Sequence, residues 1–145
     1  MPNVDLWTDG ACAGNPGPGG WAAILVAAGR TRELSGGAAD TTNNRQELTA
    51  CIEGLRALTT RCAVTIHTDS TYVLHGFEKR WLAAWKRRGW KTAAGKPVAN
   101  RDLWERLEEL VAAHQVTWMW HRGHTGVALN ERCDLLACAQ RDGHR

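Results

Sequence analysis

The sequence predicts an α/β fold in which a five-stranded mixed sheet is flanked by helices. Three strand-like stretches follow one another near the start of the chain, with glycine-rich turns between them. Beyond residue 41, stretches with helical periodicity alternate with two further strand-like stretches. Strands joined by short turns favour antiparallel pairing, whereas strands joined through helices favour parallel crossovers. The first three strands are therefore expected to be antiparallel and the later ones parallel.

The first three strands are expected at residues 4–9, 21–26 and about 31–35. Residues 4–9 alternate apolar and polar side chains, which is typical of a half-buried strand. Glycines and prolines fill residues 14–20, and Gly29 follows the second strand, so both places are expected to be turns. This segment should form an antiparallel meander.

The rest of the chain alternates helices with strands. Apolar residues recur on one side of a helix after residue 41, at Leu48, Cys51, Ile52, Leu55 and Leu58. Thr42 or Asn43 is the expected N-cap, and Ser70 is the expected cap after a fourth strand at residues 63–69. Short helices over 71–90, a helix over about 100–113, a strand at 116–121 and a helix at 128–140 follow. The expected core includes Trp104, Trp118, Trp120, Leu129, Leu136 and Ala137.

Length and composition indicate one globular domain, residues 1–145. The chain is 43% hydrophobic and 23% charged, which is near the average for globular proteins. No apolar run approaches the length of a membrane span, and the first residues do not resemble a signal peptide. Five cysteines without a C-x-x-C pair argue against a structural zinc site or a complete disulfide framework. We therefore expect a cytoplasmic protein, and a monomer in the absence of a spare apolar patch or heptad.

Basic residues are concentrated in one segment. Residues 79–101 contain eight lysines and arginines and no acid. Because the whole chain carries +3, the remainder carries a net charge of −5. A basic block on an otherwise acidic chain favours a local contact with a polyanion.

Two aspartates occupy equivalent places in the expected sheet. Asp9 and Asp69 each end an expected strand in the dipeptide Thr-Asp. If these strands are parallel neighbours, both carboxylates lie at the rim where open α/β sheets bind ligands. Each could instead be an ordinary turn former or helix cap.

Two more carboxylates lie on the apolar sides of helices. Glu47 precedes Cys51 by one helical turn, although a first-turn glutamate can also serve only to interact with the helix dipole. Asp134 has a similar position in the last helix, where pairing with Arg132 or Arg141 is the alternative.

Convergence of the four carboxylates would point to a metal site. Their mutual repulsion is costly unless a divalent cation neutralises it. A donor set made of oxygens suits Mg²⁺ or Mn²⁺ rather than zinc. Such a site can hold two ions and support hydrolysis of a phosphodiester, and His124, in a glycine-flanked loop, could relay protons there.

Five motifs in order carry a family resemblance. They are residues 8–12 (TDGAC), 14–20 (GNPGPGG), 41–48 (TTNNRQEL), 68–70 (TDS) and 130–134 (NERCD). Together they closely resemble bacterial type 1 ribonuclease H, also called ribonuclease HI. The resemblance implies a ribonuclease H-like fold and an endonuclease that hydrolyses the RNA strand of RNA–DNA hybrids, leaving 5′-phosphate and 3′-hydroxyl ends. No small-molecule cofactor is implied.

The resemblance also implies roles for individual residues. Asp9, Glu47, Asp69 and Asp134 would ligate two Mg²⁺ ions, with Mn²⁺ able to substitute, and His124 would assist proton transfer or product release. The residues expected along the minor groove beside the RNA strand are Cys12, Gly14, Asn15, Asn43, Asn44 and Glu47. The 2′-hydroxyl is both donor and acceptor, so amide and backbone groups can recognise it. Thr42 and Asn100 would hold a phosphate of the DNA strand.

The basic segment resembles the family's basic protrusion, here at about residues 79–101. By this resemblance Trp81, Lys86, Arg87 and Arg88 would grip the hybrid. Cations supply salt-sensitive attraction to phosphates, and indole rings can pack on deoxyribose or against arginine. The alternative is that the tryptophans, Trp85 above all, form the core of a helical subdomain.

Three other functions compete with this interpretation. The first is a related metal-dependent nuclease that acts on DNA, although the amides of residues 41–45 suit a 2′-hydroxyl that DNA lacks. The second is a non-catalytic hybrid-binding module, which would be expected to lack one of the four carboxylates. The third is an interaction domain whose acids are all locally paired, which would bind no stoichiometric Mg²⁺.

Overall fold

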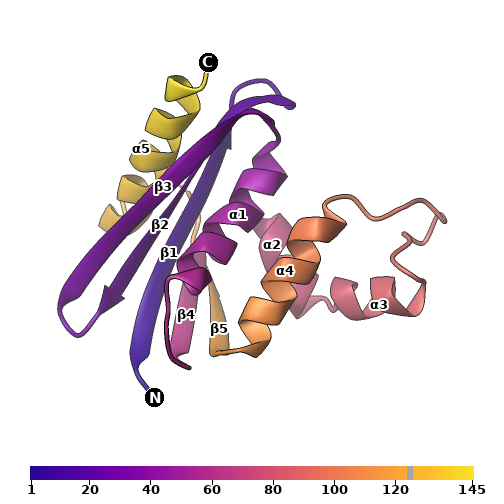
Figure 1. Cartoon of the computed structure of the whole chain (residues 1–145), viewed down its shortest axis with the longest axis horizontal. Coiled ribbons are helices and arrows are strands. Elements are labelled where there is room, and N and C mark those ends of the chain that lie inside the picture. The colour runs from indigo at the N-terminus through magenta and orange to yellow at the C-terminus, as the bar shows by residue number, and fades with distance from the viewer. Residues whose placement is uncertain (124–125) are drawn as a thin grey trace.

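Five strands form one mixed sheet in the order β3-β2-β1-β4-β5 in the computed structural model, which describes residues 1–123 and 126–145 (Figure 1). The strands are β1 (Asn3–Cys12), β2 (Gly17–Ala27), β3 (Arg30–Thr41), β4 (Ala63–Thr68) and β5 (Gln115–Trp120). β1 and β3 pair antiparallel with β2, whereas β4 pairs in parallel with both β1 and β5. The predicted mixed α/β sheet is confirmed.

Helices cover both faces of this sheet. They are α1 (Asn43–Arg56), α2 (Thr71–Glu78), α3 (Trp81–Arg87), α4 (Arg101–Ala112) and α5 (Ala128–Gly143). α1 contacts β1 and β2 on one face and also contacts α4, whereas α5 lies on β1, β2 and β3. α3 and the loop after it project away from the sheet (Figure 1). Within the described part of the chain, no helix is both long and apolar enough to cross a membrane.

Alternation along β1 produces two hydrophobic clusters, because successive side chains of a strand point to opposite faces. The cluster beneath α1 and α4 includes Leu6, Leu48, Leu55, Ile66 and Trp104. The cluster beneath α5 includes Trp7, Ile24, Cys133 and Ala137, with Leu129 and Leu136 partly buried against it. The sheet is therefore fixed from both sides near the strand ends that carry the acidic residues.

The expected boundaries of the first three strands were too short. β1 continues past Asp9 to Cys12, β2 begins at Gly17 rather than at residue 21, and β3 runs to Thr41 rather than to residue 35. Gly14 and Gly29 lie in turns as expected, but Gly17, Gly19 and Gly20 are instead paired in the sheet, with Gly20 opposite Ala11. A Cβ on Gly20 would lie only 2.2 Å from the carbonyl oxygen of Ala137, so α5 crosses too closely for any side chain there.

The two expected helix caps are confirmed. The Thr42 hydroxyl accepts from the Arg45 backbone N–H at 3.2 Å, and the Ser70 hydroxyl accepts from the Val73 N–H at 3.2 Å. These bonds satisfy donors that the first turn of a helix leaves unpaired. They also fix where α1 and α2 start relative to the ends of β3 and β4.

One expected core residue is not in the core. Trp104 is fully buried and Trp118 packs against the core, but Trp120 is 46% exposed. β5 is an edge strand, and Trp120 is its last residue. Its indole N–H donates to the carbonyl oxygen of Asp69 at 3.3 Å, so this ring borders the acidic rim instead.

Candidate active site

Three carboxylates meet at one rim of the sheet. Asp9, Glu47 and Asp69 each offer an oxygen that lies within 4.8 Å of those of the other two. The β1–β4 ladder ends at the pair Trp7 and His67, so Asp9 and Asp69 both lie two residues beyond it. Asp9 is inside β1 rather than at its end, which corrects that expectation. Parallel pairing nevertheless places the two aspartates level with each other, as predicted.

Glu47 reaches this rim because α1 lies unusually close to β1. A Cβ on Gly10 would be 2.6 Å from the backbone nitrogen of Glu47, so only glycine permits this approach. The glutamate is 5% exposed, and its Oε2 has no hydrogen-bond partner among the described residues. A carboxylate kept at a surface for the helix dipole alone would be solvated. The burial of Glu47 therefore favours a place in a metal site over an interaction with the helix dipole alone.

Asp134 of α5 lines the same cleft and interacts with Asp9 across it. It lies outside the tight group of three carboxylates. The two arginines considered as its structural partners form ion pairs elsewhere: Arg132 with Glu33 at 2.8 Å and Arg141 with Asp142 at 3.0 Å. The four predicted carboxylates are thus brought to one cleft.

The carboxylates strongly perturb one another. Burial, reinforced by the charges of Asp69 and Asp134, raises the pKa of Asp9 from its ordinary value of 3.8 to about 8. Burial, and then the charges of Asp9 and Asp69, raises the pKa of Glu47 well above its usual range. Crowded anions of this kind are relieved by a cation. An orphaned buried oxygen within a donor set made of oxygens fits a hard divalent ion.

Polar groups from two other segments line the cleft beside the carboxylates. The cleft has a volume of about 380 Å³ and includes Asn43 and Asn44 at the start of α1. The backbone N–H of Asn43 donates to Oδ1 of Asn15 at 3.0 Å, which ties the β1–β2 turn to α1. The Cys12 thiol donates to the carbonyl oxygen of Gly14 at 3.1 Å in that turn. The structure therefore brings together the residues expected to contact the RNA strand.

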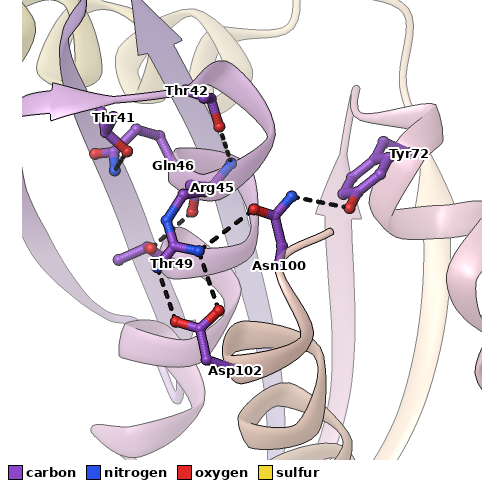
Figure 2. A network of polar contacts seen from close by, with 8 residues as sticks. All are labelled: Thr41, Thr42, Arg45, Gln46, Thr49, Tyr72, Asn100 and Asp102. Atoms are coloured by element: carbon purple, nitrogen blue, oxygen red, sulfur yellow. Dashed lines mark hydrogen bonds and ion pairs between the residues drawn. The ribbon is translucent and has the colours of Figure 1, made fainter. Parts of the chain in front are cut away.

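Thr42 and Asn100 belong to a polar network beside the cleft (Figure 2). Its centre is Arg45, a residue for which no separate role was predicted. The Arg45 guanidinium donates to Asn100 at 3.3 Å and to both carboxylate oxygens of Asp102, at 3.0 and 2.8 Å. In the sequence, the only feature that could have singled out Arg45 is its place three residues after the helix cap. Its contact with α4 could not be predicted, because that contact depends on the fold.

The predicted contacts of the basic segment fall into two groups. Arg87 and Arg88 are exposed at the end of α3, as a contact with a polyanion requires. Lys86, by contrast, already forms an ion pair with Glu108 of α4 at 2.6 Å.

The rings of Trp81 and Trp85 lie 6.0 Å apart, and Trp85 packs against the buried Trp104, so Trp85 is part of the core.

His124 lies outside the described residues. The preceding residue, Gly123, lies beside the carboxylates, because a Cβ on it would be 2.9 Å from Oδ2 of Asp69.

A mixed sheet with four carboxylates lining one cleft, in a chain that also carries an exposed cationic projection, defines a class of protein: hydrolases that act on phosphodiesters with divalent cations. Comparison with known proteins agrees with this class. The family model described as RNase H matches residues 1–142. The ribonuclease H of Nitratidesulfovibrio vulgaris is 59% identical over 140 residues, covering 97% of this chain and 90% of the relative. The chain belongs to the ribonuclease H family, whose members are nucleases.

Two solved structures extend the comparison. LC9-RNase H1, described as a type 1 RNase H with the type 2 active-site motif, has a TM-score of 0.88 and 36% identity. The match covers 100% of this chain and 74% of that one. LC11-RNase H1, solved in complex with an RNA/DNA hybrid, has a TM-score of 0.69 and covers 97% of both chains. At 20% identity, the second comparison supports the fold alone.

Proposed function

We propose that this chain is an endoribonuclease that hydrolyses the RNA strand of RNA–DNA hybrids and leaves 5′-phosphate and 3′-hydroxyl ends. The observation that carries the proposal is the convergence of Asp9, Glu47 and Asp69 in an open polar cleft. Membership of the ribonuclease H family supports the reaction. The proposed substrate is of the kind present in the solved complex of LC11-RNase H1, which shares the fold.

Mg²⁺ is the proposed cation, with two ions held when substrate is bound and with Mn²⁺ able to substitute. Asp9, Glu47, Asp69 and Asp134 would hold them through carboxylate oxygens. Bound cations of this kind activate water and stabilise the departing oxygen. The protein itself fixes the positions of the carboxylates through β1, α1, β4 and α5 and keeps Glu47 from solvent. His124, which follows Gly123 in the sequence, would transfer a proton or assist product release.

Selection of RNA is proposed to come from the wall of the cleft. Asn43 and Asn44 lie on it, Cys12 ends β1, and Gly14 and Asn15 lie in the adjoining turn. Amide and backbone groups can pair with both the donor and the acceptor of a 2′-hydroxyl. A deoxyribose would leave these groups without partners.

The other strand is proposed to bind farther along the same surface. Thr42 and Asn100 would contact a phosphate of the DNA strand. The basic protrusion at about residues 79–101 would grip the hybrid through Trp81, Arg87 and Arg88, and Lys86 would contribute once released from Glu108. We further propose that the protein acts as a cytoplasmic monomer.

Cleavage of four matched duplexes tests the proposal: RNA–DNA, RNA–RNA, DNA–DNA, and DNA that contains a short RNA block. Each is incubated with Mg²⁺ or with EDTA, and the product ends are identified. We expect cutting of RNA only where it is paired with DNA, and only with Mg²⁺. Cutting of DNA–DNA would move the protein to the DNA nucleases. Hybrid binding without cutting, in both Mg²⁺ and Mn²⁺, would identify a binding module, and no stoichiometric Mg²⁺ binding would favour an interaction domain.

A further inference from the structure

The directions of the hydrogen bonds that join Arg45, Asn100 and Tyr72 in the network of Figure 2 are fixed by groups that can only donate. The Arg45 guanidinium has no acceptor, so the atom of Asn100 that it contacts at 3.3 Å must be the carbonyl oxygen. The amide nitrogen of Asn100 therefore faces Tyr72 and donates to its hydroxyl oxygen at 3.1 Å. The indole N–H of Trp104, also a pure donor, donates to the same oxygen at 2.9 Å.

Tyr72 consequently accepts two hydrogen bonds, and its own proton must point elsewhere. One N–H of the Asn100 amide is used by Tyr72, and the other has no acceptor among the described residues. Tyr72 also lines the cleft that contains the carboxylates. The network thus presents donors near the cleft, which suits a phosphate oxygen because that oxygen only accepts.

The backbone of Asn100 shows that its side chain is not serving the local helix. Asn100 occupies the N-cap position of α4 with φ +62° and ψ +27°, and its side chain makes no cap hydrogen bond. An asparagine at such a position usually contributes its oxygen to the first turn of the helix. Here that oxygen is bound by Arg45 of a different helix. The side chain of Asn100 is therefore committed to contacts outside its own first turn, with Arg45 and Tyr72.

Asp102 is the only carboxylate drawn in the network, and it is matched by a positive charge. Both of its oxygens accept from the Arg45 guanidinium, at 3.0 and 2.8 Å. This two-point contact fixes the plane of the guanidinium, and hence the direction from which Asn100 is held. The chain of contacts runs from Asp102 through Arg45 and Asn100 to Tyr72, and every member is oriented by its neighbour.

We propose that Tyr72 is a positioning residue: by accepting from Asn100 and Trp104, it fixes the Asn100 amide so that its second N–H meets a phosphate oxygen of the hybrid. This inference rests on the proposed function, in which Asn100 contacts the DNA strand. Tyr72 acts through Asn100 on substrate binding, so its hydroxyl should influence KM rather than kcat.

Steady-state cleavage of an RNA–DNA hybrid by Tyr72→Phe tests this role, because phenylalanine keeps the ring that contacts Trp81 and Trp104. We expect KM to rise about three- to tenfold, the equivalent of one neutral hydrogen bond, with kcat within about twofold of wild type. Thr49→Val is the matched control, because it removes another hydroxyl of the network, one that donates to the Arg45 carbonyl oxygen at 2.7 Å. Its KM should remain that of wild type.

A double-mutant cycle separates positioning from a general loss of stability. Asn100→Ala should raise KM by at least as much as Tyr72→Phe, and the double variant should resemble Asn100→Ala alone, because Tyr72 acts through that amide. Additive effects of the two substitutions on KM would overturn the proposal. So would an unchanged KM in Tyr72→Phe, or a loss confined to kcat.

The proposed function and this inference can fail separately. If the wild-type protein does not cleave the hybrid, the proposed function fails. If the wild type cleaves and Tyr72→Phe keeps its KM, only the positioning role is lost. Should Tyr72→Phe fold poorly because the buried Trp104 loses its acceptor, Asn100→Asp supplies the test. It replaces the amide donor with an anionic acceptor, and a wild-type KM in that variant would overturn the proposal.

Discussion

The acidic cleft and the basic segment differ in how they are built. Glu47 and Asp9 are buried, approach each other through a contact that only glycine allows, and have strongly raised pKa values. Arg87 and Arg88 are exposed on a projection that lies apart from the sheet (Figure 1). The cleft therefore depends on tight packing, whereas the projection depends on solvated charge. Changes in the cleft should abolish the reaction, and changes in the projection should adjust affinity and its salt dependence.

The largest effect is expected from Asp69→Asn. The substitution keeps the size of the side chain but removes one charge from the proposed cation site, so kcat should fall by about a thousandfold or more. Hybrid binding should persist, because a negative charge near phosphate is lost. Asp40→Asn, an equivalent change at an exposed position, serves as the control in a cleavage assay. Undiminished turnover of Asp69→Asn would disprove the assignment of the cation site.

Gly10→Ala should damage the cleft through packing alone. Its Cβ would lie 2.6 Å from the Glu47 nitrogen, so α1 must move from β1. We expect a loss of about 1–3 kcal/mol in the free energy of unfolding, typical of overpacking, together with reduced kcat. Urea unfolding and cleavage assays measure the two effects. Gly143→Ala, where a Cβ would meet nothing within 4 Å, should leave both unchanged, and equal behaviour of the two variants would contradict this account.

Removal of Mg²⁺ should make the stability of the protein depend on pH. The pKa of Asp9 is raised from 3.8 to about 8, so between these values the folded state holds a proton that the unfolded state has released. In EDTA, the free energy of unfolding should therefore fall as the pH rises from about 4 towards 8, because the stability that Asp9 contributes is fully present only below about pH 4. Mg²⁺ should displace the proton and raise Tm more at pH 8 than at pH 5. Thermal unfolding of wild type and Asp9→Asn checks this, because the variant should lose much of the dependence.

The smallest effect is expected in the basic segment. Replacing Arg87 and Arg88 with alanine should weaken hybrid binding severalfold and reduce the slope of log K against log salt by about 0.7–0.9 per lost phosphate contact. Binding titrations in EDTA at several salt concentrations measure this slope. Arg30→Ala/Arg32→Ala is a control of equal charge on β3, far from α3 (Figure 1). A slope that falls equally in both double variants would argue against a local contact.

Lys86→Ala compares a paired cation of the basic segment with the exposed Arg87. Its ammonium group is paired with Glu108, so its removal should reduce affinity less than removal of Arg87. Single-variant binding titrations at one salt concentration provide the comparison. A larger loss for Lys86→Ala than for Arg87→Ala would contradict this account, because breaking the ion pair with Glu108 should offset part of what the lysine contributes.

Local features of the sequence were sufficient to predict the helices and strands and to single out the acids that meet in the cleft. Hydrophobic periodicity predicted α1, and the Thr42 and Ser70 caps follow from one hydroxyl and the helix that begins beside it. The two Thr-Asp dipeptides predicted a shared rim because parallel neighbours end at the same edge. These inferences succeeded because each depends on residues close in sequence or on a general rule of sheet geometry.

The sequence by itself determined the class of fold, the positions of most elements, and the four carboxylates that the fold brings to one cleft. Tertiary structure decided the true ends of β1, β2 and β3, the exposure of Trp120, and the Lys86–Glu108 ion pair. It also decided that Arg45, Asn100 and Tyr72 form one network, although they come from three different segments. The reason is physical: periodicity and capping act over a few residues, whereas strand pairing, close approach at glycine and long side-chain contacts depend on which distant segments the fold brings together.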